Sequence, residues 1–375
     1  MTGPHRAIAA TRVAVRQALR QIPQVTEVTQ STQSTQSTSS TQSTQSTQST
    51  RSDQSAQDRQ PGQIQHDGLV LVACSGGADS LALAAAAAFE APRAGLSAGA
   101  VIVDHDLQDG SLAVAERAAD QCRGLGLSPV EVVTVRVGGP GAGAGSGTGP
   151  ESRARDARYQ AFDDVLERAG AVAVLLGHTR DDQAEQVLLG LARGSGARSL
   201  SGMPARRGPY VRPFLGVARV ITVAACEAAG LTPWLDPHNS DPAYGRVRAR
   251  ALLPVLEAEL GPGTVAALAR SADLLRDDAD ALDDLAAQAR RGLGPGRVIP
   301  ATALLTLPRA IRTRVWRLLA LEAGCPPGAL IANHIDSLDT LVTGWRGQGP
   351  IDLPGHVQGS RTDGQVVVAS TRRVE

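Results

Sequence analysis

The sequence predicts an α/β fold in which a parallel sheet carries helices on both faces, followed by a helical linker and a small α+β domain. In the first part of the chain, apolar runs alternate with segments of helical pattern, which is typical of a parallel sheet built from βαβ units. Beyond residue 243 long helical patterns take over. A glycine-rich break at 292–296 then precedes a shorter mixed pattern.

Two unlike segments precede the sheet. Residues 1–28 have a helical apolar rhythm at Ile8, Val15, Leu19 and Ile22, so we expect an N-terminal helix. Residues 29–66 are rich in Ser, Thr and Gln and contain a near-perfect triplet repeat. This stretch has no apolar face to bury, which predicts a disordered insertion.

We expect the catalytic domain to span residues 67–242. Its expected strands are 69–74, 100–104, 130–135 and 171–177, and helices are expected to begin at Asp79, Ser111, Glu151 and Asp181. Ligands of such sheets bind at the carboxyl ends of the strands. The side chains expected to converge there belong to Ser75, Asp104 and His178.

Helical patterns at 218–229, 243–260 and 264–291 follow, and residues 243–291 are assigned to the linker. The C-terminal domain, 292–375, shows helices at 309–323 and 329–343 and short strands near 349–353 and 365–369. The first of these helices has an apolar stripe, so we expect it to pack on its own domain and to present arginines outward. These arginines are Arg309, Arg312, Arg314 and Arg317.

Composition narrows the class of protein. A length of 375 residues predicts about two domains. The chain has no lysine, so all 37 basic residues are arginines, and 37 acidic residues balance them. Net charge therefore gives no hint of a nucleic-acid partner, although arginine suits phosphate binding. The four cysteines lie far apart, which argues against a zinc knuckle, an iron–sulfur cluster or a disulfide framework.

No apolar run is long enough for a membrane span, and no signal-peptide core is visible. We therefore expect a cytoplasmic protein without a membrane partner. The first sixty residues contain few acids and many Ser, Thr and Gln residues, which leaves an organelle transit peptide as an alternative.

The segment Ser75-Gly-Gly-Ala-Asp-Ser80 is the most informative motif. It stands between an apolar strand and a helix, where two glycines allow a tight turn and the helix start directs N–H groups at an anion. This arrangement predicts a phosphate or pyrophosphate site. Since the segment lacks lysine, the ordinary P-loop is excluded.

A second motif, Gly177-His-Thr-Arg-Asp-Asp-Gln-Ala-Glu185, follows the fourth expected strand. Asp181, Asp182 and Glu185 lie in the first turns of a helix, where the dipole favours anions. They could serve only as helix caps, or they could bind a metal ion or a substrate ammonium. His178 could contact a nucleotide, shuttle a proton or be structural.

Taken together, the motifs resemble those of the tRNA(Ile)-lysidine synthetase family, within the N-type ATP pyrophosphatase superfamily. The similarity runs from about residue 69 to 254. Its further motifs are Val103-Asp-His105, Glu151-x-x-x-Arg155-x-x-Arg158-Tyr159, Arg193-Gly-Ser-Gly196, Gly202-Met203, Arg212-Pro213, Asp236-Pro-His-Asn-Ser-Asp241 and the arginines Arg246, Arg248 and Arg250. The resemblance implies an adenine nucleotide alpha hydrolase-like, Rossmann-like sheet.

The resemblance also implies a ligase. ATP adenylates the wobble cytidine of an isoleucine tRNA with a CAU anticodon, and free lysine then displaces AMP to form lysidine. The resemblance implies catalytic roles for Asp79, Asp181, Asp182 and His178. It implies that ATP is bound by Ser75, Gly76, Gly77, Ala78, Asp79, Ser80, Asp104 and His105. Lysine or a metal would be held by Asp181, Asp182 and Glu185, and magnesium by Asp79. Contacts to tRNA or other phosphates fall to Arg155, Arg158, Arg193, Arg212, Arg246 and Arg248.

Two other functions remain open at this stage. One is another ATP pyrophosphatase such as a tRNA thiolase, although that chemistry calls for paired cysteines, which this chain lacks. The other is a nucleotide-sensing module without turnover, although such a module has no need of Asp79, Asp181 and Asp182 together. The sequence also leaves open whether the chain forms a homodimer, and the C-terminal domain is expected to bind tRNA.

Overall fold

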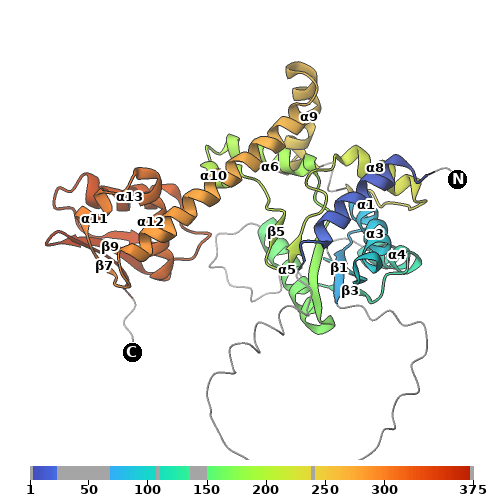
Figure 1. Ribbon diagram of the computed structural model, residues 1–375, viewed down its shortest axis with the longest axis horizontal. Coiled ribbons are helices and arrows are strands. Elements are labelled where there is room, and N and C mark those ends of the chain that lie inside the picture. The colour runs from blue at the N-terminus through green and yellow to red at the C-terminus, as the bar shows by residue number, and fades with distance from the viewer. Residues whose placement is uncertain (1–2, 23–67, 107–109, 136–149, 238–240, 372–375) are drawn as a thin grey trace, which may run out of the picture. The chain divides into compact units, whose positions relative to one another are not determined.

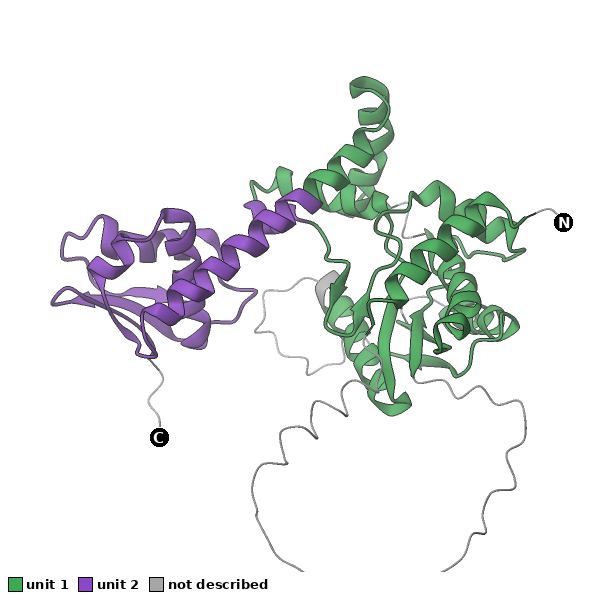
Figure 2. Ribbon diagram, in the orientation of Figure 1, with its two compact units in different colours: residues 1–195, 202–272 green, residues 196–201, 273–375 purple. Residues whose placement is uncertain are grey.

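The computed structural model describes residues 3–22, 68–106, 110–135, 150–237 and 241–371 (Figure 1). The expected Ser-Thr-Gln insertion lies outside the described residues. The chain divides into two units (Figure 2). The first comprises Met1–Ser195 and Gly202–Ala272, and the second comprises Gly196–Ser201 and Asp273–Glu375. This division falls within a helix, whereas the sequence analysis placed the start of the C-terminal domain at Gly292.

The first unit is built on a mostly parallel sheet, which confirms the predicted fold class. Its strands are β1 (Leu69–Ala73), β2 (Ser97–Asp104), β3 (Val130–Thr134), β4 (Ala171–Leu176), β5 (Arg206–Arg207) and β6 (Tyr210–Val211). Their order is β3-β2-β1-β4-β6-β5, and every neighbouring pair is parallel except β5 with β6. The last two strands were not predicted, because two residues show no alternation or apolar run.

Helices cover both faces of this sheet (Figure 1). One face packs against α1 (Arg6–Leu19), α3 (Ala78–Glu90), α4 (Ser111–Gly124) and α8 (Arg219–Ala228), and the other against α5 (Pro150–Ala169). Along β1, Val70 and Val72 enter the first core and Leu71 enters the second. Burial on both faces is why these strands appear in the sequence as unbroken apolar runs.

The strand order places the point of topological reversal between β1 and β4. The chain runs from β1 to β2 and β3 on one side and then returns to β4 on the other side of β1. In open α/β sheets ligands bind at such a point. Gly177, directly after β4, permits the close approach of α3, because a Cβ there would lie 3.3 Å from the backbone of Asp79 and Ser80.

The rest of the first unit is helical. α6 (Arg180–Ala192) follows β4 and packs against α9 (Gly245–Leu260) through a small core of Ala184, Leu253 and Val265. A 3₁₀ turn (Pro92–Ala94) precedes β2, and α10 (Thr264–Gly292) continues into the second unit. Within the described parts of the chain, no single helix is long and apolar enough to cross a membrane. α9 and α10 meet that test only when taken together, across a bend of 109°.

The second unit combines helices with an antiparallel sheet of order β7-β10-β9-β8. Trp316 is fully buried in its core. The elements are α7 (Ala197–Leu200), the second part of α10, β7 (Val298–Pro300), α11 (Ala301–Leu305), α12 (Arg309–Glu322), α13 (Ala332–Thr343), β8 (Ile351–Leu353), β9 (Val357–Thr362) and β10 (Gln365–Ser370).

One prediction about α12 is wrong. Arg312 does not point outward but is buried, with its Nε 2.7 Å from Oδ1 of Asp339, itself buried on α13. Trp316 Nε1 donates to the same carboxylate oxygen at 3.1 Å. The helix therefore buries a charged pair beside its apolar stripe, which a count of apolar positions alone does not reveal.

The other α12 arginines are also engaged within the second unit. Arg314 Nε lies 2.7 Å from a carboxylate oxygen of Asp283 on α10, and Arg317 donates to two loop carbonyls. Only Arg309 is exposed, and it pairs with Asp336 at 2.9 Å. Long arginine stems allow these guanidinium groups to reach acceptors on neighbouring elements.

Candidate active site

The loop after β1 is shaped to receive an anion. Gly76 has a φ of +79°, in the region that favours glycine, and Gly77 begins α3 without a side-chain cap. The buried Ser80 hydroxyl donates to the Gly77 carbonyl at 2.9 Å and accepts from the Ser75 N–H at 3.2 Å. Ser80 thus braces the turn from within, and the N-terminus of α3 is presented at the carboxyl end of the sheet.

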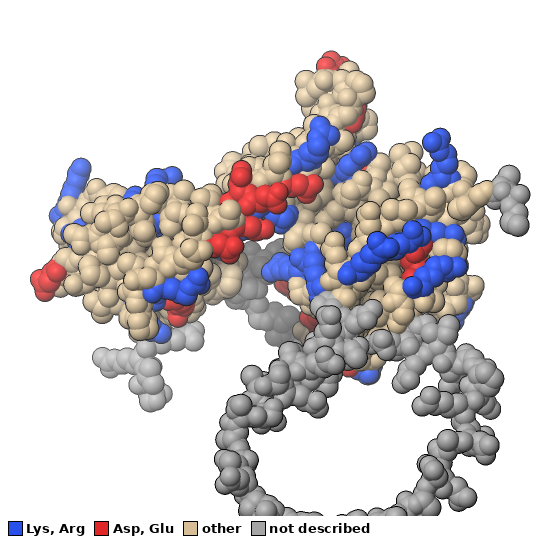
Figure 3. Space-filling view, in the orientation of Figure 1, with Lys and Arg blue, Asp and Glu red and all other residues tan. Residues whose placement is uncertain are grey.

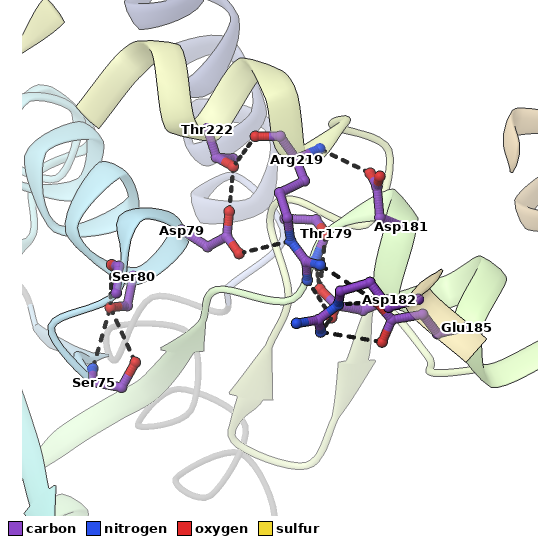
Figure 4. Close-up of polar contacts among 11 residues, drawn as sticks. Ser75, Asp79, Ser80, Thr179, Asp181, Asp182, Glu185, Arg219 and Thr222 are labelled. Atoms are coloured by element: carbon purple, nitrogen blue, oxygen red, sulfur yellow. Dashed lines mark hydrogen bonds and ion pairs between the residues drawn. The ribbon is translucent and has the colours of Figure 1, made fainter. Parts of the chain in front are cut away.

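Four predicted carboxylates contact Arg219, three through its guanidinium group and one through its backbone N–H (Figure 4). Arg219, the first residue of α8, places Nε 3.2 Å from Asp79 Oδ2, Nη2 2.7 Å from Asp182 Oδ1 and Nη1 3.3 Å from Glu185 Oε1. Its backbone N–H donates to Asp181 Oδ2 at 2.8 Å. We call these four acidic residues and Arg219 the acidic cluster.

A second cation joins the acidic cluster from α9. Arg250 Nε lies 2.6 Å from Glu185 Oε1, and its Nη2 donates to Glu185 Oε2 at 3.3 Å. The sequence analysis missed Arg219 and placed Arg250 only among arginines of the last motif. A signal for Arg219 was available, because a cation at the first position of a helix opposes the helix dipole and needs a nearby anion.

Asp182 has two roles, one for each carboxylate oxygen. Oδ2 accepts hydrogen bonds from the Thr179 N–H and hydroxyl at 2.7 and 2.8 Å, which completes a capping box at the start of α6. Oδ1 faces Arg219. Burial raises the pKa of Asp182, but Arg219 and the Thr179 hydrogen bonds outweigh it, so the pKa lies below its ordinary value. The helix-cap interpretation is therefore correct for Oδ2 of Asp182 but does not account for Oδ1.

Asp79 stands where the loop meets the acidic cluster. The Thr222 hydroxyl donates to its Oδ1, and Arg219 holds its Oδ2. Burial raises the pKa of Asp79 despite these two contacts. Within the described residues, no group of three His, Cys, Asp or Glu side chains is arranged to hold a metal ion. Mg²⁺ is commonly held by one or two carboxylates together with substrate phosphates, and Asp79 beside the loop fits that mode.

Arginine side chains lie near the two histidines of the site, His105 and His178. Arg158 donates to His105 Nε2 through Nε and Nη2, at 3.1 and 2.9 Å. Burial, followed by Arg158, lowers the pKa of His105 to about 4. Burial also lowers the pKa of His178 to about 4, and the charges of Arg212, Arg155 and Arg246 add to this although Asp182 opposes it. Both imidazoles are therefore neutral near pH 7.

Three of these arginines have no carboxylate partner among the described residues. Arg212 is only 5% exposed, and it donates to the Pro204 carbonyl at 3.0 Å and to the Tyr159 hydroxyl at 3.4 Å, while its buried Nε has no hydrogen-bond partner in the described structure. Arg155 stacks on the Tyr159 ring, and Arg158 contacts His105. Arg155 and Arg158 are exposed, whereas the buried guanidinium of Arg212, which has no counter-ion among the described residues, favours an anionic ligand.

The remaining predicted residues are placed as follows. Asp104 ends β2, is buried and accepts from the Asp106 N–H at 3.1 Å. Arg248 donates to the carbonyls of Pro242 and Ala243, at 2.6 and 2.9 Å, and so braces its own turn. Arg193 is exposed at the end of α6.

Residues 44–256 match the family model of the PP-loop domain, and residues 300–368 match that of the TilS substrate binding domain. A tRNA(Ile)-lysidine synthase of Thermobifida fusca is 51% identical, over 99% of this chain and 100% of its own length. Another, of Streptomyces coelicolor, is 54% identical over 98% of this chain and 99% of its own length. The chain belongs to the tRNA(Ile)-lysidine synthase family. Membership of this family confirms the resemblance found in the motifs.

As a member of this enzyme family, the chain is not a nucleotide-sensing module without turnover. Among solved structures, the U34-tRNA thiolase NcsA from Methanococcus maripaludis is similar with a TM-score of 0.48 and 18% identity, covering 57% of this chain and 74% of that chain. The loop after β1 lies within the residues that match the PP-loop domain model. Asp79, at the end of that loop, is part of the acidic cluster.

Proposed function

We propose that the chain ligates free L-lysine to the wobble cytidine of the CAU-anticodon isoleucine tRNA. The products are lysidine, AMP and pyrophosphate, and the modified tRNA decodes AUA as isoleucine. One observation carries this proposal. At the topological reversal of the sheet, Asp79 from the loop after β1 and two carboxylates of α6 meet around Arg219.

The loop and the arginines suit ATP. Amides at the start of α3, with Ser75 through Ser80, would bind the β- and γ-phosphates. Arg155, Arg158 and Arg212 would supply charge to phosphates of ATP or tRNA, since guanidinium forks match phosphate oxygens. Magnesium, held by Asp79 and the phosphates, would neutralise the leaving pyrophosphate.

The reaction proceeds in two steps. The carbonyl oxygen of the cytosine ring attacks the α-phosphorus of ATP, so that a bond from oxygen to phosphorus forms and pyrophosphate leaves. The lysine side-chain amine then attacks the ring carbon that carries the adenylated oxygen. AMP departs with that oxygen, and the amine gives up its protons. Carboxylates that dock the lysine cation are placed to receive one of them.

The carboxylates differ in their capacity for this docking. Asp182 and Glu185 would orient the incoming ammonium, while the half-buried Asp181 has one oxygen held by the Arg219 N–H. His178 would contact the nucleotide as a neutral imidazole. Since its pKa is about 4, it would act near pH 7 as a hydrogen-bond partner more readily than as a proton store.

The decisive assay measures release of pyrophosphate and AMP by the wild-type chain and by Asp79→Ala. We expect release that depends on tRNA with the wild-type chain and its loss in Asp79→Ala. The variant should keep its fold, because Asp79 stands at the start of α3 rather than in the core. A circular dichroism spectrum of Asp79→Ala that matches the wild type shows that the variant is folded. Wild-type turnover by this folded variant would refute the assignment of the loop. Since tRNA, ATP and free lysine meet in the cytoplasm, we also place the reaction there.

A further inference from the structure

We propose that Arg219 is a positioning residue that couples the ATP side of the active site to the lysine side. This inference rests on the proposed function and adds to it a residue that no motif indicated. Arg219 contacts carboxylates from two different elements, Asp79 on α3 and the pair Asp182 and Glu185 on α6 (Figure 4). It is the side chain that joins them.

The three guanidinium nitrogens divide the contacts between them. Nε donates a hydrogen bond to Asp79, Nη1 donates to Glu185, and Nη2 donates to Asp182. Because the guanidinium is planar and rigid, the direction of one contact fixes the directions of the other two. A shift of Asp79 on ATP binding is therefore transmitted to the carboxylates that would receive lysine.

Arg219 is itself held firmly. Its backbone N–H donates to Asp181 Oδ2 at 2.8 Å, and its carbonyl accepts from the Thr222 hydroxyl at 2.8 Å. The single hydrogen of that hydroxyl is shared between this carbonyl and Asp79 Oδ1. The first turn of α8 thus contacts both sides of the site through backbone and side chain.

The contacts of Arg219 leave room for a substrate cation. An ionised carboxylate offers about four acceptor positions. Asp182 accepts three hydrogen bonds, two from Thr179 and one from Arg219. Glu185 also accepts three, one from Arg219 and two from Arg250. About one acceptor position on each carboxylate therefore remains for an ammonium group while Arg219 stays in place, although Arg250 also lies 3.8 Å from Asp182 Oδ1.

The charge balance points the same way. Three carboxylates, those of Asp79, Asp182 and Glu185, contact the two guanidinium groups of Arg219 and Arg250, and a fourth, that of Asp181, contacts the Arg219 backbone N–H. The cluster keeps an excess of negative charge that suits an added cation. Without Arg219 the carboxylates would repel one another and lose their common orientation.

The test compares Arg219→Ala and Arg219→Lys with the wild-type chain. The KM values for lysine and ATP and the kcat are measured in lysidine synthesis, and the Kd for ATP is measured by calorimetry without tRNA. We expect Arg219→Ala to raise both KM values and to lower kcat/KM for lysine about 100-fold, the scale of a misplaced reacting group. Arg219→Lys should recover part of the loss, because it keeps the charge but not the fork.

A matched control is Arg16→Ala on α1. Arg16 forms a bidentate pair with the buried Glu90, at 2.8 Å for each contact, and lies outside the active site. It should lose stability without a change in either KM. If Arg219→Ala fails to fold, Arg219→Lys carries the test, since loss of the fork alone should raise both KM values.

Unchanged KM values in both Arg219 variants would overturn the inference. So would a lower KM for lysine in Arg219→Ala, which would show that Arg219 competes with the substrate. A wild-type chain that binds ATP but makes no lysidine would instead refute the proposed function. In that case the ATP Kd of Arg219→Ala still decides whether Arg219 orients Asp79: an increase supports this, and an unchanged value overturns it.

Discussion

At the scale of single residues, the site depends on side chains that serve two purposes. Asp182 caps α6 with one oxygen and contacts Arg219 with the other. Such a residue could be assigned to either role from sequence, because both place a carboxylate in the first turn of a helix. Only the position of Arg219 shows that both apply.

Asp182→Asn tests the second role. We expect kcat/KM for lysine to fall about 100-fold, because a neutral amide contributes no charge to a partly desolvated cation site. The control is Thr179→Ala, which removes the capping hydroxyl. It should cost about 1 kcal/mol of stability and raise the KM for lysine less than Asp182→Asn does, because the Thr179 N–H still holds Asp182 Oδ2. Steady-state kinetics and urea unfolding provide the two measurements, and a wild-type KM for lysine in Asp182→Asn would reduce the residue to a helix cap.

The lowered pKa of His105 predicts that the free energy of unfolding depends on pH. Its pKa is about 4 in the folded chain, below the ordinary value near 6.5 that the unfolded chain should show. Between these values the unfolded state binds a proton that the folded state excludes, so stability falls as the pH falls from about 6.5 to 4. The free energy of unfolding should therefore drop more between pH 7.5 and 5 in the wild-type chain than in His105→Gln. An equal drop in both would contradict this account.

At the scale of elements, the sequence was a good guide where burial is uniform. The strands β1, β2 and β4 are covered on both faces and so appear as apolar runs, whereas β3 is only partly buried. The helices after these four strands begin within a residue or two of the predicted positions. The pairs Arg219 with Asp79 and Arg250 with Glu185 join residues far apart in the chain. Their distance in sequence explains why no local pattern revealed them.

The buried pair of α12 and α13 shows the same limit and yields a prediction. Arg312→Ala would leave Asp339 buried without its cation, which typically costs about 3–5 kcal/mol. Arg309→Ala, which breaks only an exposed pair on the same helix, should cost less than about 1 kcal/mol. Chemical denaturation of the two variants compares them directly. A small and similar loss in both would show that Arg312 is not needed for the packing of the second unit.

At the scale of the whole molecule, a chain of zero net charge must bind a polyanion through local surfaces (Figure 3). In the second unit, α10 carries exposed aspartates, at Asp277, Asp278, Asp280 and Asp284, which repel phosphates. Exposed arginines of the same unit that lie outside α10 include Arg297, Arg309 and Arg346. The match of residues 300–368 to a substrate binding domain supports tRNA contact by this unit.

Replacing Arg297, Arg309 and Arg346 by alanine should weaken tRNA binding and flatten its salt dependence. Each lost phosphate contact should reduce the slope of log K against log salt by about 1, since fewer counterions are released. ATP binding, which belongs to the first unit, should not change. Filter binding over a range of salt concentrations measures the slope, and a slope identical to that of the wild-type chain would assign the second unit another role. Substitution is preferable to a deletion from Gly292, because part of α10 belongs to the second unit.

The most direct measurement is the nucleoside product. Isoleucine tRNA with a CAU anticodon is incubated with the chain, ATP and isotope-labelled lysine, then digested to nucleosides and analysed by mass spectrometry. The account predicts a labelled nucleoside with the mass of cytidine plus lysine minus water, formed only with ATP present and in equal amount to AMP. Release of AMP and pyrophosphate without lysine in the tRNA, or incorporation of lysine without ATP, would contradict it.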